Sequence, residues 1–132
     1  NIVPTTTGAS KAVGDVLPET LKKFNGLSIR VPTPVVSIID VTAVSKKKTS
    51  IEELKDIFRK ASREARWQGI VAVTEEDLVS SDFIGNSHSS IVDLNLTDVV
   101  EGDLIKIVAW YDNEWGYSNR LVEICVDLNN LR

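Results

Sequence analysis

Apolar and polar residues alternate along several short stretches of the chain, a pattern typical of half-buried β-strands. In residues 27–31 the apolar side chains fall on one face, and Ser28 and Arg30 fall on the other. β-branched residues dominate 35–45, which favours a long strand near the centre of a sheet. Similar patterns predict further strands over 69–73, 78–83, 89–94 and 104–111.

Helical spacing of apolar residues is clearest over 50–66. Ser50 and Glu53 stand three residues apart at its start, which predicts a capping box. A last helix is expected over about 116–129. Cys125 lies on the apolar stripe of that helix, so a buried and inert thiol is expected there.

The order of these elements predicts the fold class. Strands that follow one another directly along the chain favour an antiparallel or mixed sheet with helices on one face, an α+β fold. The 132 residues suit one domain, and 42% hydrophobic with 26% charged residues is typical of a globular chain. The net charge of −4 gives no reason to expect nucleic acid or an anionic membrane as a partner. No apolar run approaches the roughly 20 residues that cross a bilayer, and a cytoplasmic location is expected.

The counts of cysteine, histidine and methionine narrow the candidate chemistry. One cysteine excludes an internal disulfide, and one cysteine with one histidine cannot form a Cys/His zinc cluster, so no metal site is expected. His88 stands among serines in a predicted turn and is expected to be a structural or surface residue. The chain has no methionine and begins with Asn1. We therefore expect it to be a piece of a longer polypeptide.

Two positions are candidates for binding an anion. Thr7 and Gly8 precede a short predicted helix, where free N–H groups, the helix dipole and a hydroxyl favour a phosphate oxygen. Ordinary helix capping explains the same residues. Arg30, on the polar face of its strand, is suited to clamp a phosphate through two parallel hydrogen bonds. The alternative is a surface arginine whose stem covers apolar neighbours.

Aromatic residues crowd the turn between the strand at 104–111 and the last helix, in the sequence WYDNEWGYSNR. A turn of this kind can direct the side-chain amide of Asn113, which is both donor and acceptor, at a planar ligand that carries an amide. An aromatic corner of the core is the alternative. The residues by themselves therefore indicate an α+β domain with phosphate- and amide-recognition positions, and they name no reaction.

Several segments closely resemble phosphorylating glyceraldehyde-3-phosphate dehydrogenase, and they occur in that family's order over nearly the whole chain. They are residues 1–14, RVPTP at 30–34, the stretch 79–90 and WYDNEWGYSNR at 110–120. The resemblance implies the later part of the family's catalytic domain. The NAD-binding Rossmann domain, the nucleophilic cysteine and the histidine base would then all precede Asn1, leaving no catalytic residue in this chain.

In that family a thiolate attacks the aldehyde of glyceraldehyde 3-phosphate, hydride passes to NAD, and inorganic phosphate releases 1,3-bisphosphoglycerate. The resemblance implies that Thr7 and Gly8 bind the attacking phosphate and that Arg30 contacts phosphate. It also implies that Asn113 binds the nicotinamide carboxamide and that Tyr117 packs near the nicotinamide ring.

The resemblance leaves the substrate and the role of the chain open to a few alternatives. The closely related erythrose-4-phosphate dehydrogenase is the second enzyme considered. A non-catalytic folding or assembly unit is the alternative from a different class, and the chain alone is expected to be inactive. The resemblance further implies a homotetramer for the full-length protein.

Overall fold

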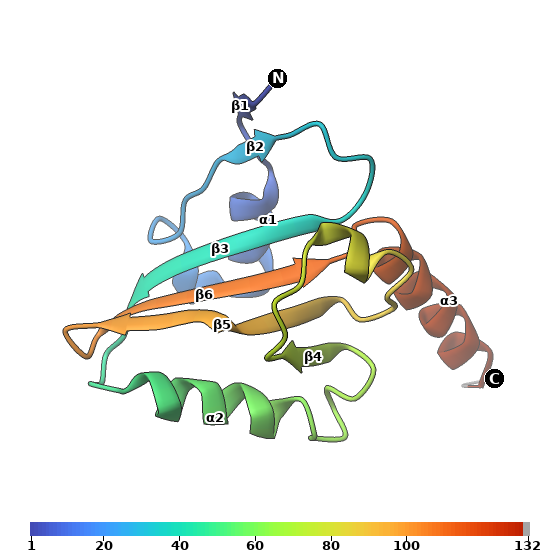
Figure 1. Cartoon of the computed structure of the whole chain (residues 1–132). Helices are drawn as coiled ribbons and strands as arrows, with labels where there is room; N and C mark the ends of the chain where they lie inside the picture. Colours follow the sequence, from blue (N-terminus) through green and yellow to red (C-terminus); the bar gives the residue numbers. More distant parts are fainter. Residues whose placement is uncertain (131–132) are drawn as a thin grey trace. The chain divides into compact units, whose positions relative to one another are not determined.

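A computed structural model describes residues 1–130, except for the side chain of Ser10. The chain divides into two compact units, residues 1–34 and a second unit that begins at Val35. Figure 1 gives the course of the chain and the labels of its elements.

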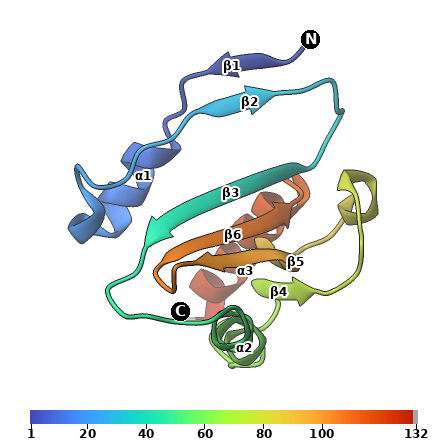
Figure 2. The same ribbon diagram turned by 60° about the vertical axis from the view of Figure 1, so that its left-hand side comes forward.

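The first unit contains a small hairpin-like sheet and two short helices. Strand β1 (Val3–Thr5) pairs antiparallel with β2 (Ser28–Arg30). Helix α1 (Ala9–Val16) and the 3₁₀ helix η1 (Pro18–Thr20) lie between them in the sequence. Figure 2 shows β1 alongside β2. The alternation over 27–31 correctly predicts β2, whereas β1 has no comparable pattern because its three residues are all exposed.

The second unit is built on a four-stranded sheet. Its strands are β3 (Ser37–Val44), β4 (Val71–Thr74), β5 (Ser90–Val100) and β6 (Leu104–Tyr111), in the spatial order β3-β6-β5-β4. The pairs β3/β6 and β5/β6 are antiparallel, whereas β4/β5 is parallel. The sheet is therefore mixed, which confirms the α+β fold class. The long strand predicted over 35–45 is an edge strand and not a central one.

Helix α2 (Ile51–Ala61) lies against β4 and β5, as both views show. Its start is as predicted, because the hydroxyl of Ser50 accepts a hydrogen bond from the Glu53 backbone at 3.2 Å. The Glu53 carboxylate accepts instead from the Thr49 hydroxyl, at 2.9 Å. The helix ends at Ala61, earlier than the predicted residue 66, and the Ser62 hydroxyl donates to the carbonyl of Arg59 just beyond this end.

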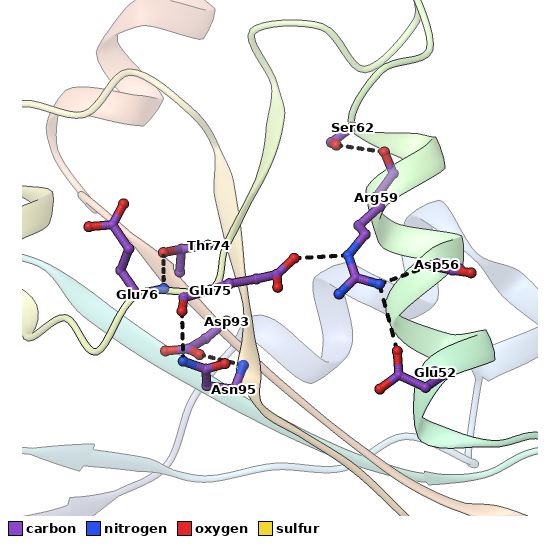
Figure 3. Close-up of polar contacts among 9 residues, drawn as sticks. All are labelled: Glu52, Asp56, Arg59, Ser62, Thr74, Glu75, Glu76, Asp93 and Asn95. Carbon is purple, nitrogen blue, oxygen red and sulfur yellow. Dashed lines mark hydrogen bonds and ion pairs between the residues drawn. The ribbon is translucent and has the colours of Figure 1, made fainter.

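Arg59 ties α2 to the end of β4 (Figure 3). Its guanidinium donates to Glu75 at 2.9 Å and to Asp56 at 2.8 Å. These contacts raise the pKa of Arg59 and lower that of Glu75. The Asn95 side chain in turn donates to the backbone carbonyl of Glu75 at 2.9 Å. Arg59 therefore braces the helix against the sheet.

Two apolar clusters form the core of the second unit. One contains Val36, Phe83 and Ile91, and the other contains Val92, Leu94 and Ala109 with Phe58 of α2 packed against it. The second cluster sits at an irregularity in β5. Between the pairs Asp93↔Val108 and Asp98↔Lys106, four residues of β5 lie opposite one residue of β6. The irregularity carries β5 beyond residue 94, where the predicted strand ends.

Two further expectations from the sequence are wrong. The strand predicted over 78–83 is a 3₁₀ helix, η2 (Ser80–Phe83), because the Asp82 carboxylate accepts a hydrogen bond from the Val79 backbone at 2.8 Å and closes a turn. Cys125, expected to be buried, is exposed. It lies in helix α3 (Trp115–Asn130), whose apolar residues from Leu121 onward are also exposed. Among residues 1–130, no helix has the length and apolar content that spanning a bilayer requires.

Candidate functional site

The turn from β6 into α3 is organised by a buried carboxylate. The side chain of Asp112 is 4% exposed. One of its oxygens accepts from the backbone N–H groups of Glu114 at 3.0 Å and Trp115 at 2.8 Å. The other accepts from the backbone of Gly85 at 3.0 Å. Asp112 thus closes the first turn of α3 and joins it to the loop after η2.

The same contacts decide the charge state of Asp112. Burial by itself raises the pKa of a carboxyl group, because it disfavours the charged form. Hydrogen bonds from the backbones of Trp115, Gly85 and Glu114 act in the opposite direction and together outweigh burial, so the pKa of Asp112 is lowered. The group is therefore an anion at neutral pH, and it also complements the positive end of the helix dipole.

Asn113 follows Asp112 directly and is exposed. Its side-chain oxygen Oδ1 accepts a hydrogen bond from the hydroxyl of Ser37 at 3.2 Å. Ser37 is the first residue of β3 and pairs in the sheet with Tyr111, two residues before Asn113. Tyr117 lies in the first turn of α3 and is 65% exposed. The two residues expected at a nicotinamide therefore both lie at the junction of β6 and α3, and both are open to a ligand.

The beginning of α3 is fixed by two further residues of the aromatic motif. A Cβ atom on Gly116 would lie 2.9 Å from the carbonyl oxygen of His88, so only glycine fits this close approach. Arg120, one helical turn further on, donates to the carbonyl of Gly69 at 3.1 Å and to the hydroxyl of Ser89 at 3.2 Å. The sequence reasoning did not assign these roles, although the spacing of Gly116 and Arg120 places them on one face of a helix.

Thr7 and Gly8 lie at the start of α1, as expected. The Thr7 hydroxyl accepts from the backbone N–H of Ala9 at 3.1 Å, and the Gly8 carbonyl accepts from Lys11 and Ala12. There is open space where Gly8 would carry a side chain, and α1 has no acidic residue in its first turn. The arrangement suits close approach of an anion to the backbone, and it equally serves as a cap.

Arg30 is exposed and ends β2, where it pairs with Val3. Thr7 lies four residues beyond Val3, which corresponds to at most about 13 Å of extended chain. The register of β1 and β2 therefore places Arg30 and Thr7 at different ends of the small sheet.

The remaining candidate groups show no catalytic arrangement in the part of the chain that the structure describes. His88 is half-buried, and its Nδ1 lies 2.9 Å from the side-chain oxygen of Asn86. Cys125 lines a shallow apolar hollow with Leu121, Val122, Val126 and Asn129. No group of His, Cys, Asp and Glu side chains within 1–130 is arranged to hold a metal ion.

Comparison with known proteins now assigns the family. The family described as "Glyceraldehyde 3-phosphate dehydrogenase, C-terminal domain" matches residues 1–113 of the 132 in the chain. The chain belongs to this family. The match includes the positions of Thr7, Gly8, Arg30 and Asn113, and it stops before Tyr117.

Curated relatives carry the same name. A glyceraldehyde-3-phosphate dehydrogenase of Borreliella burgdorferi is 53% identical over 129 residues, 97% of this chain and 38% of that protein. A cytosolic enzyme of Antirrhinum majus is 45% identical over 132 residues, 100% of this chain and 39% of that protein. A chloroplastic enzyme of Arabidopsis thaliana is 50% identical over 124 residues, 94% of this chain and 29% of that protein. The chain thus spans less than two fifths of the length of these relatives.

Proposed function

We propose that this chain is the phosphate-binding and nicotinamide-contacting portion of an NAD-dependent glyceraldehyde-3-phosphate dehydrogenase. Membership of the family, together with the fixed turn that presents Asn113, carries this proposal. The substrates are glyceraldehyde 3-phosphate and inorganic phosphate. In the proposed arrangement the nucleophilic cysteine, the histidine base and the Rossmann domain belong to the rest of the protein.

The first unit supplies the groups that bind phosphate. Thr7 and Gly8 offer a hydroxyl and an unobstructed backbone to the attacking phosphate, and Arg30 offers a cation to a phosphate at the other end of the small sheet. Charge-assisted hydrogen bonds of this kind lower the energy of a phosphate anion at a fixed position. Their function is to hold the anion where it can reach the acyl group.

The second unit supplies groups that fit the nicotinamide of NAD. The fit follows from the side-chain amide of Asn113, which is exposed and fixed by Ser37, and from the exposed ring of Tyr117. An amide is complementary to the carboxamide of nicotinamide, and an aromatic ring can pack against its plane. Bound NAD would supply the hydride acceptor. Asn113 would orient the ring, and Tyr117 would limit the water beside it.

The phosphate role is tested with Arg30→Ala in the full-length enzyme, beside the control Arg63→Ala at an exposed arginine of the second unit. We expect kcat/KM for phosphate to fall by the equivalent of at most about 3 kcal/mol, the scale of one charge-assisted contact. Arg63→Ala should leave it unchanged. Equal kinetics for Arg30→Ala and the wild type would remove Arg30 from the site.

The substrate is tested by comparing two aldehydes with the full-length enzyme. Glyceraldehyde 3-phosphate should be oxidised with the higher kcat/KM, and faster oxidation of erythrose 4-phosphate would replace the proposed substrate. The chain of residues 1–132 alone should form no NADH from glyceraldehyde 3-phosphate, NAD and phosphate. NADH formation by this chain would show that it contains a nucleophile.

The proposal extends to assembly and location. A homotetramer is expected for the full-length protein, and sedimentation of that protein measures it. A cytosolic location is expected as well. The printed names of the relatives include both a cytosolic and a chloroplastic enzyme, so fractionation of the source cells decides between these compartments.

A further inference from the structure

Ser37 is held in place by an unusual piece of backbone. The residue before it, Val36, has φ of 74°, in the left-handed region that β-branched residues rarely adopt. Val36 is 8% exposed and packs in a cluster with Phe83 and Ile91. Such strain persists only where the surrounding structure over-determines it, and it is concentrated at functional sites. The packing of Val36 therefore fixes the point at which β3 begins, and with it the position of the Ser37 hydroxyl.

Ser37 and Asp112 hold Asn113 in complementary ways. Asp112 fixes the backbone that follows Asn113, through the N–H groups of Glu114 and Trp115, and it joins this turn to the loop at Gly85. Ser37 fixes the side chain, because its hydroxyl occupies Oδ1 of the amide at 3.2 Å. The hydrogen bond joins residues 76 positions apart in the sequence. This bond directs Oδ1 toward Ser37. Among the described residues the NH₂ group of Asn113 has no hydrogen-bond partner, so both of its hydrogens are available to a ligand.

We infer that Ser37 is a positioning residue, and that it sets the amide of Asn113 so that its NH₂ group donates to the carbonyl oxygen of the ligand's carboxamide. Ser37 does not contact the ligand in this scheme and acts through Asn113. The inference rests on the proposed function of Asn113 and specifies which half of the carboxamide that residue recognises. A ligand that keeps the carbonyl oxygen and lacks the NH₂ group should therefore retain the contact.

The ligand side is tested by measuring dissociation constants for the full-length enzyme, by calorimetry or by quenching of tryptophan fluorescence. NAD is compared with 3-acetylpyridine adenine dinucleotide, in which a methyl group replaces the NH₂ of the carboxamide. Asn113→Ala should weaken both ligands by a similar factor, roughly five- to tenfold, as expected for one hydrogen bond. Weaker binding of NAD alone would mean that Asn113 accepts from the carboxamide NH₂, which overturns the inference and leaves the proposed nicotinamide site standing. Unchanged binding of both would remove Asn113 from the site and so refute the proposed function itself.

The protein side is tested with Ser37→Ala, Ser37→Thr and the control Thr42→Ala, which removes an exposed hydroxyl from the same strand. Ser37→Ala should weaken NAD binding about threefold, Ser37→Thr should restore it, and Thr42→Ala should not change it. In the Asn113→Ala background, Ser37→Ala should cause no further loss, because its effect passes through Asn113. A further loss of equal size in that background, or wild-type affinity in Ser37→Ala itself, would overturn the role of Ser37. If Ser37→Ala does not fold, Ser37→Thr and the comparison of the two ligands still decide the orientation of the amide.

Discussion

Residues 1–34 and residues 35–130 hold their candidate ligand-binding side chains in different ways. In the first unit, Arg30 ends an exposed three-residue strand, and Thr7 accepts one local hydrogen bond. In the second unit, Asn113 is fixed by a buried carboxylate and by a hydroxyl from another strand. The apolar core residues that the structure describes all belong to the second unit.

The difference follows from the chemistry that each unit is proposed to perform. A phosphate is nearly spherical and carries charge on every oxygen, so backbone N–H groups and a long cationic side chain can bind it without a precise angle. A carboxamide is planar and has a donor side and an acceptor side. It is therefore recognised only by a group whose orientation is fixed.

The largest expected effect is a difference in hydrogen exchange between the two units of the 132-residue chain. Amides in β2 should exchange at least about 1,000-fold faster than those of Val92 and Val108, because short exposed strands open locally while core strands open only with the fold. Exchange followed by NMR or mass spectrometry measures this. Similar protection in both units would show that residues 1–34 are held as firmly as the core.

Leu94→Ala should cause the next largest effect. Leu94 is 0% exposed at the irregularity of β5, so its truncation leaves a cavity and should lower the free energy of unfolding by about 3 kcal/mol. The matched variant is Leu96→Ala, two residues away and 47% exposed, which should cost less than about 1 kcal/mol. Urea denaturation measures the free energy of unfolding of both variants. Equal losses for Leu94→Ala and Leu96→Ala would show that Leu94 is not part of the core.

Local signals in the sequence explain why much of the second unit could be predicted. The start of α2 follows from Ser50 and Glu53, and β6 follows from its run of β-branched residues, since these signals lie within one turn or one strand. The end of α2 could not be found from periodicity, because Ala65 continues the apolar spacing after the helix has ended. The strand predicted over 78–83 is wrong for a similar reason, since the turn depends on one hydrogen bond to Asp82.

The candidate site was predictable only in part. Asn113 is found through its motif, but Ser37 lies 76 residues away and its hydrogen bond depends on the pairing of β3 with β6. The role of Asp112 depends on Gly85, which the fold brings to it from a separate loop. Contacts across the sheet leave no periodic pattern in the sequence, so local reasoning cannot detect them.

Gly116→Ala tests whether the start of α3 is fixed against the loop at His88 or behaves as an ordinary helix end. Alanine normally favours a helix over glycine, but here its Cβ would lie 2.9 Å from a backbone oxygen of His88, which cannot move independently. We expect a net loss of about 2 kcal/mol in unfolding free energy. Gly26→Ala, at a position with no atom within 4 Å of the added Cβ, should cost much less. A stabilised Gly116→Ala would mean that α3 can shift away from the loop.

Asp112→Asn should produce the smallest of these effects, and one that depends on pH. The pKa of Asp112 is lowered in the folded state, so its charge stabilises the fold above the unfolded-state value of about 3.9, and that stabilisation is lost as pH falls through the folded-state pKa. An amide keeps one acceptor oxygen but loses the charge, so Asp112→Asn should cost about 1 kcal/mol at pH 7 and progressively less as the pH approaches 3. Urea denaturation across this range measures the change, with the exposed Asp127→Asn as control. A penalty that is the same at pH 7 and pH 3 would show that Asp112 acts through the shape of its side chain and not through its charge.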